Sequence, residues 1–244
     1  RPTMIQEQNA FPGMTNRILA KFVDRIAVAF PRALEIFGRD GEVTGNPVRR
    51  EFFKTVERRT MEGPVRILIF GGSQGSRVLN EAMKGALDHL EDLSGRIEIV
   101  HQTGPGDEEG VRARYLSSAF TGANVTPFIE DMAGAMARSD IVVCRAGAIT
   151  VGELAAVGRA AILVPFALAS DDHQEFNARS VEEGGGAIVL TEAELTPQRL
   201  ADEIRELVTD AKRIDEMGKS AGRLGAPDAT TRIVEMLEDA MKID

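Results

Sequence analysis

Residues 65–76, Val-Arg-Ile-Leu-Ile-Phe-Gly-Gly-Ser-Gln-Gly-Ser, decide the fold. The apolar run is short and rich in β-branched residues, which is typical of a strand buried on both faces. The glycine turn after it is expected to open a helix. A second junction of this kind joins Ile-Val-Val-Cys at 141–144 to Arg-Ala-Gly-Ala-Ile-Thr at 145–150. Because helix N-termini present free N–H groups to anions, two such turns in one domain predict a diphosphate site.

Strands and helices alternate on both sides of these junctions. The patterns predict strands at 65–70, 97–101, 124–126, 141–144, 160–164 and 187–190, helices at 76–91, 110–120, 150–157, 171–183, 197–209 and 211–223, and a short helix opening at 128–132. This order predicts an α/β fold with a Rossmann-like, doubly wound parallel sheet that binds ligands at the carboxyl ends of its strands.

The residues before this region predict a separate unit. Strands are expected at 3–5, 25–30 and 42–44 and a helix at 15–23, and a last helix is expected from 228 to the end. We therefore expect three parts, residues 1–45, 46–226 and 227–244, with a boundary near Asn46.

Composition excludes other classes of protein. The chain has 244 residues, of which 43% are hydrophobic and 27% charged, and its net charge is −9. This charge argues against broad binding of nucleic acid. The single cysteine excludes an intrachain disulfide. No apolar run reaches the about 20 residues that span a bilayer.

The glycine turn at 71–75 could also be purely structural, since a tight turn between a strand and a helix needs glycine even where no ligand binds. A dinucleotide site fits poorly because G-x-G-x-x-G spacing is absent and the next strand ends in His101-Gln102, where an acid that binds ribose is expected. A P-loop needs a lysine that this turn lacks.

The second junction carries more specific residues. Thr150 can cap the helix or bind phosphate, and Glu153 lies one turn further along. A carboxylate can accept hydrogen bonds from both hydroxyls of a ribose, although an acid here also stabilises its own helix N-terminus.

Amides gather at the start of the helix predicted at 171–183. Gln174 and Asn177 share a helix face and can bind sugar hydroxyls, although a well-capped helix would also explain them. No metal site is expected, because the three histidines lack ligand spacing. Cys144 is expected to pack at a strand end.

Together these residues resemble the MurG family of bacterial N-acetylglucosaminyltransferases. The resemblance covers nearly the whole chain, and the motifs that carry it are Glu7-Gln8-Asn9, Gly45-Asn46-Pro47-Val48-Arg49, the turn at 71–76 with Asn80, Phe128-Ile129-Glu130-Asp131-Met132, Cys144-Arg145 with Thr150 and Glu153, and Asp172-His173-Gln174 with Asn177.

The resemblance implies a two-domain GT-B fold whose C-terminal domain binds the donor, UDP-GlcNAc. It implies that the diphosphate is held by Arg49, Gly72, Ser73 and Thr150, the uracil by Phe128 and Ile129, the ribose by Glu153, and the GlcNAc hydroxyls by His173, Gln174 and Asn177. Asn80, Ala148 and Ile149 are further substrate-binding candidates. Glu7 and Asn9 would face the acceptor, with Glu7 as a candidate base.

The resemblance also implies the reaction. GlcNAc would pass with inversion from UDP-GlcNAc to undecaprenyl-pyrophosphoryl-MurNAc-pentapeptide, without a metal or cofactor, at the inner face of the bacterial cytoplasmic membrane. Two other functions stay open: a nucleotide-sugar-binding module that needs a partner N-terminal domain, and an enzyme similar to UDP-GlcNAc 2-epimerases.

The sequence departs from the family at two points. The family's N-terminal glycine-rich loop and membrane-facing patch are missing, so we expect an N-terminally truncated chain in which 1–45 is the remnant of the acceptor domain. The family usually has His before Glu-Gln-Asn, whereas this chain has Gln6, an amide that cannot move a proton.

Overall fold

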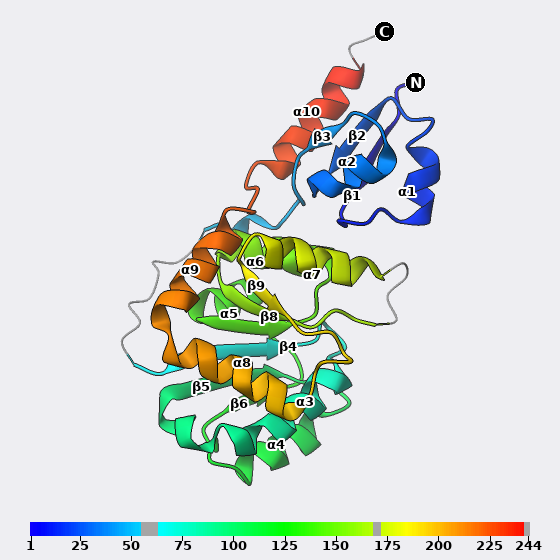
Figure 1. The fold of residues 1–244 in the computed structure, drawn as a ribbon. Helices are drawn as coiled ribbons and strands as arrows, with labels where there is room; N and C mark the ends of the chain where they lie inside the picture. The colour runs from blue at the N-terminus through cyan, green and yellow to red at the C-terminus, as the bar shows by residue number, and fades with distance from the viewer. Residues whose placement is uncertain (55–62, 168–171, 242–244) are drawn as a thin grey trace.

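The computed structural model describes residues 1–54, 63–167 and 172–241 and contains two parallel sheets (Figure 1). The larger sheet has the strand order β6-β5-β4-β7-β8-β9. Its strands are β4 (Val65–Phe70), β5 (Ile97–Gln102), β6 (Asn124–Thr126), β7 (Ile141–Cys144), β8 (Ala160–Leu163) and β9 (Ala187–Val189). These bounds confirm the six predicted strands to within one residue.

The strand order reverses between β4 and β7. From β4 the chain adds β5 and β6 on one side, and it then returns to add β7, β8 and β9 on the other. In open α/β sheets such a reversal leaves a crevice at the carboxyl ends of the two central strands. Both glycine turns of the sequence leave the sheet at this crevice.

Successive residues of β4 pack against opposite layers of helices. Ile67 and Ile69 belong to one core with α3 (Arg77–His89), α4 (Glu108–Leu116), α8 (Pro197–Thr209) and α9 (Ala211–Gly222). Leu68 and Phe70 belong to a second core with α5 (Met132–Arg138), α6 (Ala148–Val157) and α7 (His173–Glu183). Burial on both faces explains why the strand sequence is continuously apolar.

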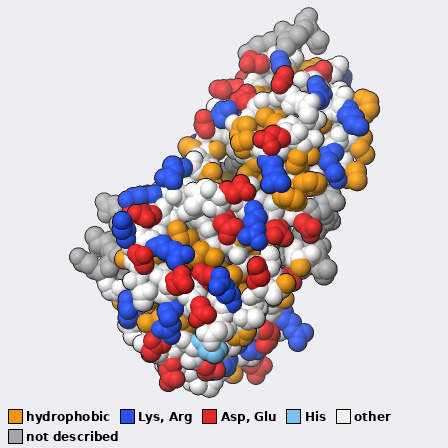
Figure 2. Space-filling view, viewed as in Figure 1, with side chains coloured by type: hydrophobic (Ala, Val, Ile, Leu, Met, Phe, Trp, Pro, Cys, Tyr) orange, Lys and Arg blue, Asp and Glu red, His pale blue; other side chains and the backbone are white. Residues whose placement is uncertain are grey.

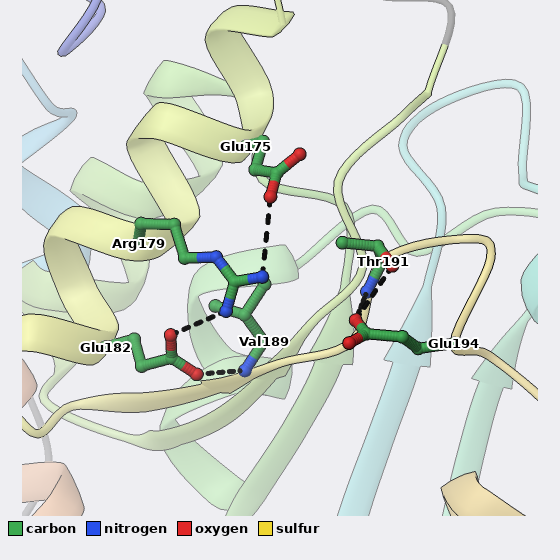
Figure 3. A network of polar contacts seen from close by, with 6 residues as sticks. All are labelled: Glu175, Arg179, Glu182, Val189, Thr191 and Glu194. Atoms are coloured by element: carbon green, nitrogen blue, oxygen red, sulfur yellow. Dashed lines mark hydrogen bonds and ion pairs between the residues drawn. The ribbon is translucent and has the colours of Figure 1, made fainter.

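Ion pairs link successive turns of α7, and a carboxylate joins its last turn to the edge strand β9. Arg179 contacts Glu182 at 2.8 Å and Glu175 at 3.4 Å, and Glu182 accepts a hydrogen bond of 2.9 Å from the Val189 N–H (Figure 3). The last turn of α7 is thereby held to β9, and Glu175 of its first turn is paired within the helix.

The smaller sheet has the order β1-β2-β3 and lies beside α10 (Figure 1). Its elements are β1 (Met4–Glu7), α1 (Met14–Leu19), β2 (Arg25–Val28), α2 (Pro31–Phe37) and β3 (Glu42–Val43), and α10 spans Ala229–Met241. Arg232 of α10 pairs with Glu42 at 2.7 Å. The last helix therefore returns to the first sheet.

Some predicted boundaries were wrong. Helix α2 was not predicted, although Pro31 starts it and Gly38 ends it in a left-handed conformation. The helix expected at 110–120 is α4, which begins at Glu108 and ends at Leu116. Helix α5 begins at Met132, so Phe128 lies in the loop before it, and α6 begins at Ala148 rather than 150. Asp171 and residues 242–244, which were expected to be helical, lie outside the described residues.

Short 3-10 turns, η1 (Arg50–Phe52) and η2 (Glu91–Arg96), complete the described elements. None of the helices in the described ranges is long and apolar enough to cross a bilayer. On the face seen in Figure 2, basic and acidic side chains are interspersed, so no field of one sign covers that face.

We predict that Gly75→Ala destabilises the protein more than Gly72→Ala. Both glycines have positive φ, +76° and +94°, which costs an L-residue about 1–2 kcal/mol. A Cβ at Gly75 would also lie 2.0 Å from the Thr103 carbonyl oxygen, whereas a Cβ at Gly72 meets nothing within 4 Å. Urea unfolding of both variants should show an additional loss of about 1–3 kcal/mol for Gly75→Ala. Equal losses would contradict the close approach of the two loops.

Candidate functional site

The two turns at the crevice present helix N-termini in different ways. Gly72 and Ser73 are exposed, and the Gly75 N–H closes the turn onto the Gly72 carbonyl at 2.9 Å. Ser76 caps α3 by accepting from the Leu79 N–H at 3.4 Å. At α6 the N-cap is Gly147, which provides no side-chain cap. The first N–H groups of α6 are therefore available to an anionic ligand.

Three candidates lie in the first turn of α6. Ile149 is 42% exposed, Thr150 is half-buried, and Ala148 is buried. These positions suit contact with a ligand through backbone N–H groups and one hydroxyl. The structure brings them to the same crevice as Ser73.

Arg49 and Glu153 form the charged part of the site. The Arg49 guanidinium lies 3.5 Å from Glu153 and 2.8 Å from Glu51, and it stacks over the Phe52 ring at 5.0 Å. Burial raises the pKa of Glu153, and the charge of Arg49 partly opposes that rise. Arg49 lies in the linker between the two sheets, and its guanidinium contacts Glu153 of α6.

Phe128 and Ile129 lie in the loop between β6 and α5. Phe128 is 56% exposed, while Ile129 packs against the core that contains Leu68 and Phe70 of β4. An exposed aromatic ring beside a partly buried aliphatic side chain suits the face of a planar base. The sequence reasoning missed Gln102, whose amide donates to the carbonyls of Gly72 and Pro127.

Asn177 bridges the two parts of the chain. Its side chain is fully buried, and its oxygen accepts from the Ala10 N–H at 2.8 Å. Its Nδ2 donates to the Asn9 side chain at 3.0 Å and to the Ala146 carbonyl at 3.2 Å. In this conformation the amide holds protein groups, so the expected contacts of Asn177 and Asn9 with substrate stay predictions.

Asn46 forms a second bridge, which the sequence did not predict, although it placed Asn46 at a domain boundary and in a motif of the family resemblance. Its Nδ2 donates to the Gln8 carbonyl at 2.9 Å and to the Ala148 carbonyl at 3.2 Å, and its oxygen accepts from Gln6 at 3.3 Å. The amide therefore ties the loop after β1 to the start of α6. Gln6 takes part in this bridge as a hydrogen-bond donor to Asn46.

Stacked aromatic rings form a further contact between the loop after β1 and α7. Phe11 stacks on Phe176 of α7 with ring centroids 4.9 Å apart, and the Arg32 guanidinium covers Phe176 at 4.6 Å. His173 and Gln174 precede this stack, and Gln174 accepts from the Phe166 N–H at 3.1 Å. Both side chains are half-buried at the start of α7.

Glu7 is 3% exposed and organises its own loop. One carboxylate oxygen accepts from the backbone and side-chain N–H groups of Asn9 at 2.8 and 3.1 Å. The other accepts from the Gly13 N–H at 3.2 Å and from Asn16 at 2.8 Å. An open depression of about 350 Å³ lies beside it, lined by residues 6–9 and 13–16. The role of Glu7 as a base stays a prediction.

Asn80 lies behind the glycine turn and is 1% exposed. It donates to the Thr103 carbonyl at 3.0 Å and to Asp107 at 2.9 Å, and its oxygen lies 3.0 Å from the His101 ring. Burial lowers the pKa of His101 to about 4, so this ring is neutral at pH 7. The structure gives Asn80 contacts with the chain, and its contact with substrate stays a prediction.

Cys144 ends β7 as expected, fully buried in the core. Burial raises the pKa of its thiol, which does not suit a nucleophile. Within the described ranges, no three His, Cys, Asp or Glu side chains gather where they could hold a metal ion.

Comparison with known proteins identifies relatives over the whole chain. The model of the glycosyltransferase family 28 C-terminal domain matches residues 66–233. A UDP-N-acetylglucosamine–N-acetylmuramyl-(pentapeptide) pyrophosphoryl-undecaprenol N-acetylglucosamine transferase of Myxococcus xanthus is 43% identical over 98% of this chain and 63% of its own length. The transferase of that name from Acetivibrio thermocellus is 41% identical over 99% of this chain and 67% of its own. This chain thus spans less than two thirds of the first of these relatives.

Solved structures agree with this relationship. The crystal structure of Acinetobacter baumannii MurG aligns with a TM-score of 0.83 and 36% identity, covering 98% of this chain and 68% of that one. A putative UDP-N-acetylglucosamine 2-epimerase from Listeria monocytogenes aligns over 96% of this chain and 64% of its own, with a TM-score of 0.67 and 18% identity, which is a likeness of fold alone. The expected fold class is confirmed.

We predict that Arg49→Met raises the pKa of Glu153 further, because Arg49 is the cation that opposes the effect of burial. A carboxyl whose pKa is raised by folding contributes stability below its unfolded value of 4.5, and this contribution is lost as pH rises through the folded-state pKa. The variant moves that window upward. NMR titration of the glutamate carboxyl carbons at low salt, with Glu153→Gln to assign the signal, measures it. A lower pKa in Arg49→Met would contradict the electrostatic coupling.

We predict that Asn177→Ala loosens the contact between the loop after β1 and α7. The change leaves the Ala10 N–H and the Ala146 carbonyl unpaired at a cost of about 1–3 kcal/mol per buried group. Hydrogen exchange at the Ala10 amide should accelerate. Gln198→Ala removes an exposed amide that, among the described residues, donates to Asp202, and it should leave the exchange at Ala10 unchanged. Unaltered protection of Ala10 in Asn177→Ala would refute the bridge.

Proposed function

Since this chain belongs to the MurG family, and its residues 66–233 to the glycosyltransferase family 28 C-terminal domain, we propose that it transfers GlcNAc from UDP-GlcNAc to undecaprenyl-pyrophosphoryl-MurNAc-pentapeptide. One observation carries the proposal. The turn after β4, the uncapped N-terminus of α6 and the Arg49–Glu153 pair meet at the carboxyl edge of adjacent strands.

The donor-binding roles follow from the chemistry of each group. Ser73, Thr150 and Arg49 would bind the diphosphate, with Gly72 letting its backbone approach closely. Glu153 would accept from the ribose hydroxyls. Phe128 and Ile129 would hold the uracil, and Gln174 with His173 would meet the GlcNAc at the start of α7.

The proposed reaction is a direct displacement with inversion. The C4 hydroxyl of the muramyl sugar attacks the anomeric carbon of GlcNAc, the bond to the diphosphate breaks, and UDP leaves. Negative charge develops on the leaving oxygen, where Arg49 and the N-termini of α3 and α6 stabilise it. Glu7 is proposed to take the proton of the attacking hydroxyl.

The acceptor carries a long lipid, so we propose that the whole protein works at the inner face of the bacterial cytoplasmic membrane. We also propose the division into 1–45, 46–226 and 227–244. The two separate sheets and the return of α10 to the first sheet support this division.

Calorimetric titration with UDP-GlcNAc tests the donor site. Glu153→Ala should weaken binding about tenfold or more, because hydrogen bonds to a charged group contribute about 1.5–3 kcal/mol. Glu98→Ala is the matched control, since this exposed acid pairs only with Arg66 among the ion pairs of the described residues.

Two results would count against the proposal. A folded chain that binds no UDP-GlcNAc lacks a complete donor site. Release of a 2-epimerised sugar in the absence of acceptor would instead favour an enzyme similar to the 2-epimerases, and product analysis detects it.

A further inference from the structure

We propose that Gln102 is a positioning residue that sets the distance between the diphosphate-binding turn and the base-binding loop, an inference that rests on the proposed function. The residue ends β5 and is 2% exposed. Its side-chain nitrogen donates to the Gly72 carbonyl at 3.0 Å and to the Pro127 carbonyl at 3.1 Å. One amide thus joins two loops that leave different strands.

The register of the sheet puts Gln102 in the middle of this arrangement. It pairs with Phe70, the last residue of β4, on one side and with Thr126, the last residue of β6, on the other. The chain continues from Phe70 into the glycine turn and from Thr126 into Pro127. A side chain at this position can therefore reach both outgoing loops.

Each of the two loops also has a hydrogen bond of its own. The Gly72 carbonyl also accepts from the Gly75 N–H at 2.9 Å, which closes the turn beneath Ser73. On the other side, Thr126 donates from its hydroxyl to the Phe128 carbonyl at 2.9 Å. The amide of Gln102 therefore connects two loops that each have a further hydrogen bond of their own.

The chemistry of the amide suits this role. A primary amide has two N–H donors, one for each carbonyl, and carries no charge that burial would penalise. Glutamate would direct oxygen at two carbonyl oxygens, and methionine would fill the space without donating. A nucleoside diphosphate contacts both loops at once, so its affinity depends on their spacing, whereas a fragment that contacts one loop does not depend on it.

The test compares Gln102→Met with the unaltered chain for three probes: UDP, uridine and inorganic pyrophosphate. We expect UDP affinity to fall about tenfold, while the affinities of uridine and pyrophosphate change less than about twofold. Ile97→Val, at the opposite end of β5, is the control for a change in stability that does not touch either loop. It should leave binding of all three probes unchanged.

The outcomes separate the two proposals. If Gln102→Met leaves UDP affinity unchanged, or lowers the affinities of all three probes equally, the positioning role is overturned. The proposed donor site is not contradicted by either result. An unaltered, folded chain that binds no UDP overturns the proposed function and this inference with it.

Discussion

Parallel pairing of β4 with β7 is the constraint on which the site depends. The pairing aligns Phe70 with Cys144, so the turn before α3 and the turn before α6 leave the sheet side by side. Each helix N-terminus carries a partial positive charge, and their adjacency directs both toward one crevice. A register shift of one residue would move one turn by about 3.3 Å and reverse the faces of the strand. The burial of β4 on both faces therefore protects the geometry of the site as well as the core.

Neutral amides hold the segments around this crevice together. Asn46, Gln102 and Asn177 are each less than 10% exposed, and each binds the backbone of two segments that are distant in sequence. An amide offers donors and an acceptor without the large cost of burying a charge. Arg49 and Glu153 add a charged pair to this frame, and the buried carboxylate of Glu7 is satisfied by four N–H donors.

Local patterns predicted the strands well because a buried parallel strand is marked by its own apolar residues. They failed at α2 because this helix has only seven residues, too few for its apolar period to stand out, although Ala33, Leu34 and Phe37 all pack in the core of the small sheet. Long-range contacts left no local signal: Asn177 and Ala10 are 167 positions apart. The family resemblance identified Asn80 and Asn177 as important residues, yet their side chains bind the chain itself. For Gln102 the sequence offers one signal, its place at the end of a strand, and the two loops that its amide joins are 30 and 25 positions away.

The surroundings of Glu7 constrain the chemistry proposed for it. A carboxylate has about four acceptor positions, and here four N–H groups from Asn9, Gly13 and Asn16 occupy them. To receive a proton from an acceptor hydroxyl, Glu7 must release at least one of these donors. Asn9, one of the donor residues, is also bound to Asn177 of α7. Release of Asn9 would loosen the loop that contacts the proposed sugar-binding helix, whereas release of Gly13 or Asn16 would leave the bond between Asn9 and Asn177 in place. The choice of donor therefore decides whether proton removal by Glu7 disturbs the proposed donor subsite.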